Sequence, residues 1–113
     1  MARQAVNDNQ LAQAQTYLQW VIDKAESPSL REVARLRLSR VLAAQQQYAA
    51  ALQVLTVTDD EAYQGLAQET RGDIFKAQGN LAQAKQAYQQ ALDALPKEAT
   101  GRMLLTMKWQ NVN

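Results

Sequence analysis

The chain has 113 residues, no cysteine and no histidine, and its 12 Lys and Arg nearly balance its 11 Asp and Glu. The absence of cysteine excludes disulfides and thiolate metal sites, and a net charge of +1 is far from the basic excess that nucleic-acid binding usually requires. Without histidine, the commonest general base and nitrogen ligand, the sequence predicts no active site, no metal site and no cofactor, and therefore no enzyme.

Helix-breaking residues divide the chain into six predicted helices, because they supply helix caps, tolerate left-handed backbone or lack a backbone donor. The breaks are at Asp8-Asn9, Ser27-Pro28-Ser29, Thr58-Asp59-Asp60, Gly79-Asn80 and Pro96. The predicted helices span about 10–25, 30–46, 48–57, 60–78, 81–94 and 98–109. We expect Ser29 to cap the second helix, with Glu32 three residues later as its capping-box partner.

Internal repetition is the strongest signal in the sequence. Leu-Ala-Gln-Ala occurs at 11–14 and again at 81–84. Small and large residues then alternate at spacings of 3, 4, 5, 4, 3 and 5 through Gly72, Phe75, Gly79, Ala84, Tyr88, Ala91 and Pro96. Small residues let two antiparallel helices approach closely, and the large ones fill the space one turn away. The pattern resembles a tetratricopeptide repeat.

Weaker copies of this unit precede it. Four positions of the pattern recur 33 residues earlier in the chain. There Ser39 and Leu42 correspond to Gly72 and Phe75, and Ala51 and Leu55 correspond to Ala84 and Tyr88. The first helix matches only the second half of a repeat, so we expect its partner helix upstream of residue 1. The predicted fold is one all-α domain, 1–113, of antiparallel hairpins in a right-handed stack. It comprises a half repeat at 9–27, repeats at 30–58 and 60–96, and a capping helix at 98–109.

Three stretches carry a closer resemblance. They are residues 36–42 (Leu-Arg-Leu-Ser-Arg-Val-Leu), Gly72-Asp73-Ile74 followed by 76–80 (Lys-Ala-Gln-Gly-Asn), and 103–108 (Met-Leu-Leu-Thr-Met-Lys). Together they resemble the periplasmic region of the YfgM-like ancillary subunit family of the SecYEG translocon. The resemblance implies a non-catalytic protein-binding scaffold at the periplasmic side of the bacterial inner membrane. Its implied partners are SecYEG and periplasmic chaperones.

The resemblance also implies a membrane anchor upstream of this chain. The sequence itself has no run of ~18 apolar residues, so we expect it to be soluble and to make no membrane contact of its own.

The predicted protein-binding surface is the outward side of the first helix of each hairpin, which lines the concave face of a repeat stack. Its residues are Val33, Leu36, Arg37 and Arg40 in the earlier hairpin and Leu66, Glu69, Asp73 and Lys76 in the later one. A mixture of apolar side chains and charged side chains of both signs suits the binding of a peptide or a partner helix. Because Arg40 and Asp73 occupy equivalent positions, a surface ion pair between them is the alternative.

The terminal helices offer two further surfaces. Near the C-terminus, Met103 and Met107 form one stripe and Leu105 and Trp109 another; one should cover the last hairpin, and we assign Leu105 and Trp109 to the binding surface. Near the N-terminus, Tyr17 and Trp20 lie on the side that the expected upstream helix would cover, so they are exposed here or bind a second copy as a homodimer.

Two hypotheses for the function remain open. The first is protein binding in the cell envelope in support of protein export. The second is a structural homo-oligomerisation module that recognises no client.

Overall fold

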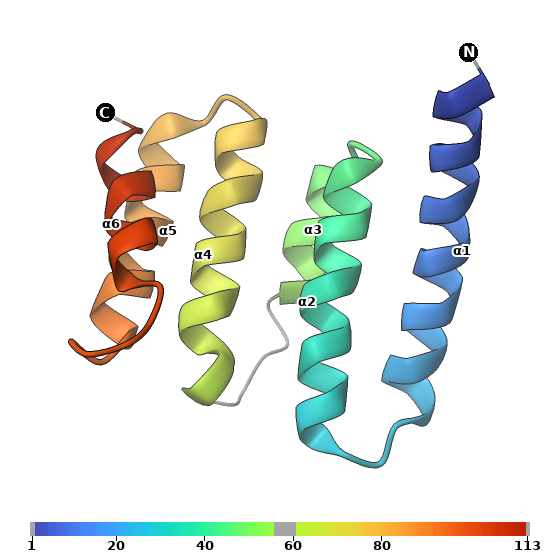
Figure 1. Ribbon diagram of the computed structural model, residues 1–113, viewed down its shortest axis with the longest axis horizontal. Coiled ribbons are helices and arrows are strands. Elements are labelled where there is room, and N and C mark those ends of the chain that lie inside the picture. Colours follow the sequence, from blue (N-terminus) through green and yellow to red (C-terminus); the bar gives the residue numbers. More distant parts are fainter. Residues whose placement is uncertain (1, 56–60, 113) are drawn as a thin grey trace. The chain divides into compact units, whose positions relative to one another are not determined.

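The chain folds into consecutive helical hairpins. The computed structural model describes the backbone of residues 2–55 and 61–112 and the side chains of residues 9–55 and 63–112. The helices of these ranges are α1 (Ala2–Lys24), α2 (Pro28–Ala44), α3 (Tyr48–Leu55), α4 (Glu61–Ala77), α5 (Leu81–Ala94) and α6 (Arg102–Gln110). They form two compact units, Met1–Val57 and Thr58–Asn113 (Figure 1). The predicted all-α class and hairpin order are confirmed, whereas the handedness of the stack and the repeat boundaries stay predictions.

The first helix begins earlier than predicted. The sequence places its start at about residue 10, but α1 begins at Ala2 and runs through Asp8 and Asn9 without a break. Relative to alanine, Asn and Asp each destabilise a helix interior by only about 0.7 kcal/mol, which is too little to end a helix rich in Ala and Gln. The predicted break at 58–60 lies outside the described residues.

The start of α2 corrects the predicted cap. Ser27, not Ser29, is the N-cap, and its Oγ accepts a hydrogen bond from the backbone N–H of Leu30 at 3.3 Å. Pro28 follows as the first helical residue, where its fixed φ fits the helix and no backbone donor is needed. Glu32 takes no part in a capping box; its Oε1 lies 2.6 Å from Nη1 of Arg35.

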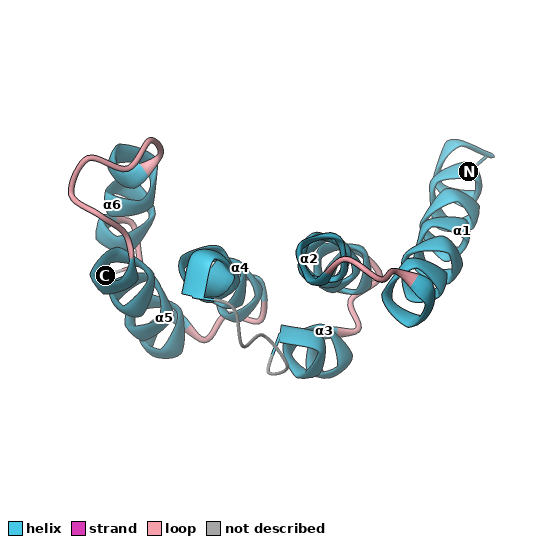
Figure 2. Cartoon of the chain, turned by 90° about the horizontal axis from the view of Figure 1, so that it is seen from below, coloured by secondary structure: helices cyan, strands magenta, loops and turns pink. Residues whose placement is uncertain are grey.

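In the first unit α2 packs against both α1 and α3 (Figure 2). Ser39 and Ala51 are fully buried, and Ser39 Oγ donates a hydrogen bond to the backbone carbonyl of Ala51 at 2.9 Å. A hydroxyl in direct contact with the neighbouring backbone requires the two helices to approach closely. The small residues that the repeat pattern places here therefore set the distance between α2 and α3.

The two hairpins turn in the same way. Gln46 after α2 and Gly79 after α4 stand 33 residues apart and both have left-handed backbone, with φ of 64° and 81°. In each turn the next residue's N–H donates back into the helix, from Gln47 to Leu42 and from Asn80 to Phe75, at 2.9 and 2.8 Å. This is the hydrogen-bond pattern of a helix that ends at a left-handed residue. Gln46 thus preserves a glycine-type turn without glycine.

In the second unit the core lies between α4, α5 and α6. Its buried residues are Ala84, Tyr88, Ala91, Leu92, Leu105 and Val112, with Phe75, Leu95 and Trp109 packed against them. The last helix begins at Arg102 rather than at the predicted residue 98, because Gly101 has a φ of 91° and precedes it as its N-cap. The Tyr88 ring of α5 packs directly on Gly72 of α4, where it occupies the place of the missing side chain.

We predict that Gly72→Ala destabilises the fold by about 1–3 kcal/mol, the usual range for overpacking in a core. The added Cβ would overlap the Tyr88 ring, with Cζ at 2.9 Å, and a ring fixed in the core has little room to move. Urea unfolding followed by circular dichroism measures the change.

The matched control for this substitution is Gly65→Ala, in the same helix. There the new Cβ meets the Cδ2 of Leu95 at 3.1 Å, and this is the end of a flexible side chain. Because alanine gains about 1 kcal/mol over glycine in helix propensity, this variant should be unchanged or slightly stabilised. If both variants lost the same free energy of unfolding, the special role of the contact between Gly72 and Tyr88 would be contradicted.

Candidate protein-binding surface

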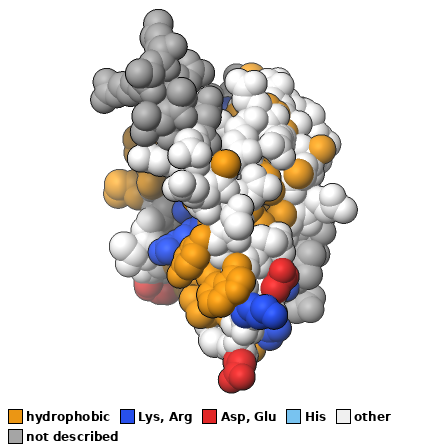
Figure 3. Space-filling view, turned by 90° about the vertical axis from the view of Figure 1, so that its right-hand side faces the viewer, with side chains coloured by type: hydrophobic (Ala, Val, Ile, Leu, Met, Phe, Trp, Pro, Cys, Tyr) orange, Lys and Arg blue, Asp and Glu red, His pale blue; other side chains and the backbone are white. Residues whose placement is uncertain are grey.

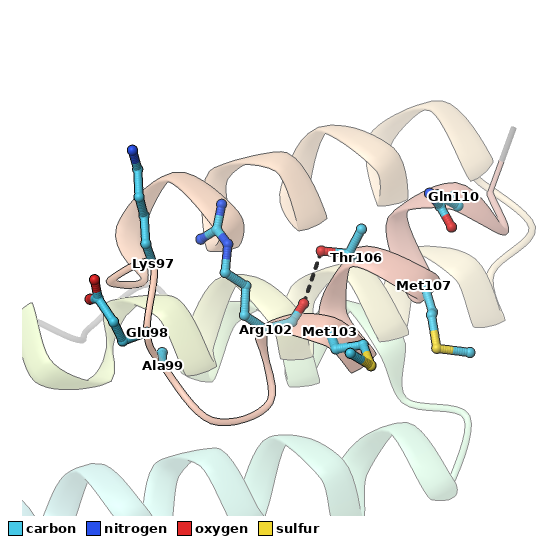
Figure 4. Close-up of a pocket in the computed structure, with 8 residues that line it drawn as sticks. All are labelled: Lys97, Glu98, Ala99, Arg102, Met103, Thr106, Met107 and Gln110. Carbon is cyan, nitrogen blue, oxygen red and sulfur yellow. Dashed lines mark hydrogen bonds between the residues drawn. The ribbon is translucent and has the colours of Figure 1, made fainter.

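The last helix exposes a patch of apolar side chains. Met103 is 80% exposed, and Leu104 and Met107 are each more than half exposed. These three residues are called the Met103 face below. Met103 and Met107 also line a shallow hollow of about 500 Å³, together with Lys97, Glu98, Ala99, Arg102, Thr106 and Gln110 (Figure 4). Exposed methionine adapts to many apolar partners, so this face suits the binding of a protein.

The opposite side of α6 holds the helix on the core. Leu105 is fully buried, so the prediction that it faces a partner is wrong. Trp109 packs against the core cluster, and the centroid of its ring lies 4.4 Å from the Nζ of Lys85 on α5. Of the two predicted stripes, Leu105 and Trp109 therefore cover the hairpin, and Met103 and Met107 remain exposed.

Arg102 fixes the beginning of α6. Its Nη1 donates to the backbone carbonyls of Leu92 and Leu95, at 2.9 and 3.4 Å. These are among the last carbonyls of α5, which have no partner within their own helix. The guanidinium points toward α5, whereas Met103 and Met107 lie on another side of α6 (Figure 4).

Lys108 fixes the other end of α6. Its Nζ lies 2.7 Å from Glu69 Oε2 and 3.2 Å from Asp73 Oδ2, both on α4. Asp73 also accepts a hydrogen bond of 2.6 Å from the hydroxyl of Tyr88. Glu69 and Asp73, predicted to bind a partner, are thus brought together to hold α6. The predicted pair of Asp73 with Arg40 of the other unit stays a prediction.

This cluster shifts the acidity of two of its members. Burial raises the pKa of the Tyr88 phenol, and the hydrogen bond to Asp73 and the charges of Asp73 and Glu69 raise it further. Burial acts to lower the pKa of Lys108. The hydrogen bond to Glu69, together with the charges of Asp73 and Glu69, outweighs burial, so the pKa of Lys108 is raised.

The predicted residues on α2 divide into two groups. Arg37 and Arg40 are exposed and Val33 is half-buried, but Leu36 is only 6% exposed, so its predicted outward position is wrong. The prediction treats α2 as packed on one side, whereas α2 packs against both α1 and α3. On α4, Leu66 and Lys76 are exposed as expected.

The first helix carries a second exposed apolar surface. Tyr17 and Trp20 are 63% and 58% exposed, as predicted, and their rings stack with centroids 6.3 Å apart. With Ala12, Gln13 and Thr16 they line a shallow hollow, and these five residues are called the α1 stripe below. Seen from the side where α1 lies, apolar side chains form a patch bordered by charged ones (Figure 3).

Neither a metal cluster nor a membrane span is found in the parts of the chain that the structure describes. Among these residues, no group of three or more Asp or Glu is arranged to hold a metal ion. No helix within the same ranges combines the length and the apolar character that crossing a bilayer requires.

We predict that the free energy of unfolding falls above about pH 10. Because the pKa of Tyr88 is raised from 10.0, the unfolded chain loses this proton at a lower pH than the folded chain, which weakens folding as the pH rises. Lys108, raised from 10.5, contributes stability that is present below that value and is lost as the pH rises through its folded pKa. Urea unfolding from about pH 7 to 11 measures both.

Tyr88→Phe separates the two contributions. It keeps the ring but removes the phenol, so it should lose about 1 kcal/mol near pH 7 and show a shallower alkaline decrease. Tyr17→Phe removes an exposed phenol and is the control. An alkaline decrease that is the same in Tyr88→Phe as in the unchanged chain would contradict the role assigned to Tyr88.

Comparison of the sequence with known proteins shows the family to which the chain belongs. Residues 1–113 match the family described as "Tetratricopeptide repeat-like domain". Over 95 residues, 84% of this chain, the sequence is 36% identical to the "Ancillary SecYEG translocon subunit" of Neisseria gonorrhoeae. The match covers 46% of that protein, so the chain spans less than half the length of this curated relative. No solved structure matches the chain.

Proposed function

Because the chain belongs to the tetratricopeptide repeat-like domain family, we propose that it is a non-catalytic scaffold that binds other proteins. The predicted half repeat, two repeats and capping helix would act together as one such domain. The observation that carries the proposal is the Met103 face, where three large apolar side chains stay exposed on a helix fixed at both ends. An apolar surface held rigid by its own fold loses little conformational freedom on binding.

The translocon is the proposed place of action. The relative from Neisseria gonorrhoeae is named an ancillary SecYEG translocon subunit, and this supports a role beside SecYEG in protein export. We therefore propose a location at the periplasmic side of the bacterial inner membrane, with an anchor helix upstream and with periplasmic chaperones as further partners.

The charged outward positions are further proposed contacts, each within its own unit. Arg37 and Arg40 on α2 and Lys76 on α4 are exposed, and Leu66 adds an apolar side chain. Val33 and Trp109 would contribute their accessible edges. Glu69 and Asp73 are engaged by Lys108, so their proposed role is to hold α6 in place rather than to meet a partner directly.

Self-association is the second candidate function. The exposure of Tyr17 and Trp20, stacked on one side of α1, favours it, because aromatic side chains are enriched at protein interfaces. In this alternative the domain would assemble with copies of itself and recognise no client.

Direct binding to purified SecYEG in lipid nanodiscs tests the first proposal. We expect Met103→Ser combined with Met107→Ser to weaken binding at least tenfold, about 1.4 kcal/mol, because these side chains supply the apolar contact. Biolayer interferometry gives the affinity. Arg37→Glu with Arg40→Glu, measured in the same way, tests the contribution of α2.

The matched control removes exposed leucines elsewhere. Leu30 and Leu81 are 51% and 44% exposed and are not part of the Met103 face, so Leu30→Ser with Leu81→Ser is the control for a general loss of exposed apolar surface. This control should bind within about twofold of the unchanged chain, a difference of less than about 0.5 kcal/mol. Equal weakening by both pairs would mean unspecific apolar contact, and no binding by the unchanged chain would refute the translocon role.

A further inference from the structure

We propose that the α1 stripe is covered by the segment of the same chain that precedes Asn9. In this arrangement α1 breaks at Asn9, and the preceding segment folds back as the first helix of a hairpin whose second helix is the remainder of α1. The inference goes beyond the translocon role and does not depend on it. It competes with self-association, because a stripe covered by its own chain is not free to bind a second copy.

The repeat register places a hairpin turn at Asn9. The shared Leu-Ala-Gln-Ala motif aligns α1 with α5 at an offset of 70 residues, and this offset pairs Asn9 with Gly79. An offset of 37 residues aligns α1 with α3 and pairs Asn9 with Gln46. Gln46 and Gly79 are the two residues at which the observed hairpins turn with left-handed backbone. Asparagine is one of the few other residues that adopt this backbone readily, so Asn9 suits the same turn.

The segment before Asn9 carries the small residue that a hairpin crossing requires. Ser39 and Gly72 each stand seven positions before the left-handed residue of their turn. Ala2 stands seven positions before Asn9. Ser39 and Gly72 both contact the second helix of their hairpin directly. An alanine at this position allows a helix that ends before Asn9 to approach α1 equally closely.

The burial of α1 indicates that one side of it lacks a partner helix. Ala14 and Leu18 are only partly buried, although α2 packs against α1. The residues at the same positions of α3 and α5 have at most 4% of their surface exposed, and they are Ala51, Leu55, Ala84 and Tyr88. Both α3 and α5 pack against the helix that precedes them in their hairpin. A preceding helix would complete the burial of α1 in the same way.

The stripe lies on the side of α1 that the preceding helix covers in the α4–α5 hairpin. The register places four stripe residues at α5 positions that line a small cleft, namely Gln83, Gln86, Ala87 and Gln90. The other wall of this cleft consists of Gln68, Arg71 and Phe75 of α4. In α1 the equivalent side is open, since Tyr17 and Trp20 are both more than half exposed.

Side-chain volumes in the stripe match the segment before Asn9. In the α4–α5 cleft the first helix contributes the large Phe75 and the second helix the small Ala87. In α1 the sizes are exchanged, because the register places Ala5 at the position of Phe75 and Tyr17 at the position of Ala87. A hairpin with alanine in its first helix has room for the Tyr17 ring. Packed interfaces tolerate exchanges that conserve the total volume better than other exchanges.

The length of the preceding helix decides between the hairpin and the continuous α1 of the structure. Eight residues precede Asn9 in this chain, and a separate helix of that length is unstable without a partner. Adding the same residues to α1 requires no new helix nucleus. Trp20 lies at the end of the stripe far from the turn, so residues N-terminal to Ala2 have to cover it. The relative from Neisseria gonorrhoeae has more than half of its length outside the matched region, which is enough for such a helix.

Disulfide trapping tests the hairpin in the chain as it is, which has no cysteine of its own. Ala2→Cys with Ala14→Cys places thiols at the positions of Ser39 and Ala51, which are joined by a hydrogen bond of 2.9 Å. In a continuous helix the two thiols are about 18 Å apart along the axis, whereas a disulfide requires Cα atoms within about 7 Å. The matched control is Ala2→Cys with Gln15→Cys, because position 15 follows position 14 but points about 100° away around the helix.

We expect the test pair to form a disulfide within one chain at least about tenfold faster than the control pair. Asn9→Gly should accelerate the test pair further and not the control pair, because glycine favours the left-handed turn. Asn7→Ala, in the same segment but outside the turn, should leave the ratio of the two rates unchanged. Non-reducing mass spectrometry over a time course measures the rates.

A chain extended at its N-terminus tests whether the stripe is the docking surface. Residues 61–71 of α4, placed before Ala2 instead of Met1, complete a first helix in the register of the α4–α5 hairpin. In a Trp109→Phe background, Trp20 is the remaining tryptophan. Its quenching by acrylamide should fall in the extended chain, and its emission should shift to the blue. Ala2→Leu in the extended chain is the matched control, because a large side chain at the crossing keeps the two helices apart.

Three results would overturn the proposal. Equal oxidation of the two cysteine pairs would mean that α1 stays continuous at Asn9. Disulfides that form only between chains would assign the stripe to a second copy. If the extended chain is helical by circular dichroism and Trp20 is quenched as strongly as before, a different partner covers the stripe. Binding to SecYEG nanodiscs is measured on unsubstituted Asn9 and Trp20, so the translocon role stands or fails separately.

Discussion

The contact between Gly72 and Tyr88 is the constraint on which the rest of the second unit depends. Because Gly72 has no side chain, the Tyr88 ring packs against α4, and its hydroxyl reaches Asp73 beside it. Asp73 and Glu69 then bind Lys108 of α6. One close approach between two helices therefore fixes a polar cluster that positions the third, and that position decides which side of α6 is exposed.

The first unit reaches the same hairpin with different chemistry. Ser39 replaces Gly72, and its hydroxyl uses the close approach to donate to the Ala51 carbonyl instead of making room for a ring. Leu55 replaces Tyr88 and is also buried, but it has no hydroxyl to extend toward a carboxylate. The repeat pattern thus preserves the distance between helices, while the polar groups at the crossing differ from one repeat to the next.

The sequence predicts what depends on two neighbouring helices and misses what depends on a third. The small residues at the crossings follow from local spacing, because too large a side chain cannot be placed where helices cross. The left-handed Gly79 follows from the turn between two helices, since glycine tolerates a positive φ. Leu36 and Leu105 are buried by additional helices that a helical wheel does not include. The two stripes of α6 are similar in hydrophobicity, and contacts with Lys85, Glu69 and Asp73, all distant in sequence, decide between them.

The nine residues of α6 interleave two independent tasks. Arg102, Leu105, Lys108 and Trp109 attach the helix, whereas Met103, Leu104 and Met107 have most of their surface free. Substitutions in the second set change what the domain presents while leaving the first set intact. The three exposed positions can therefore be substituted to change what the domain binds, while the residues that attach α6 to the scaffold stay the same.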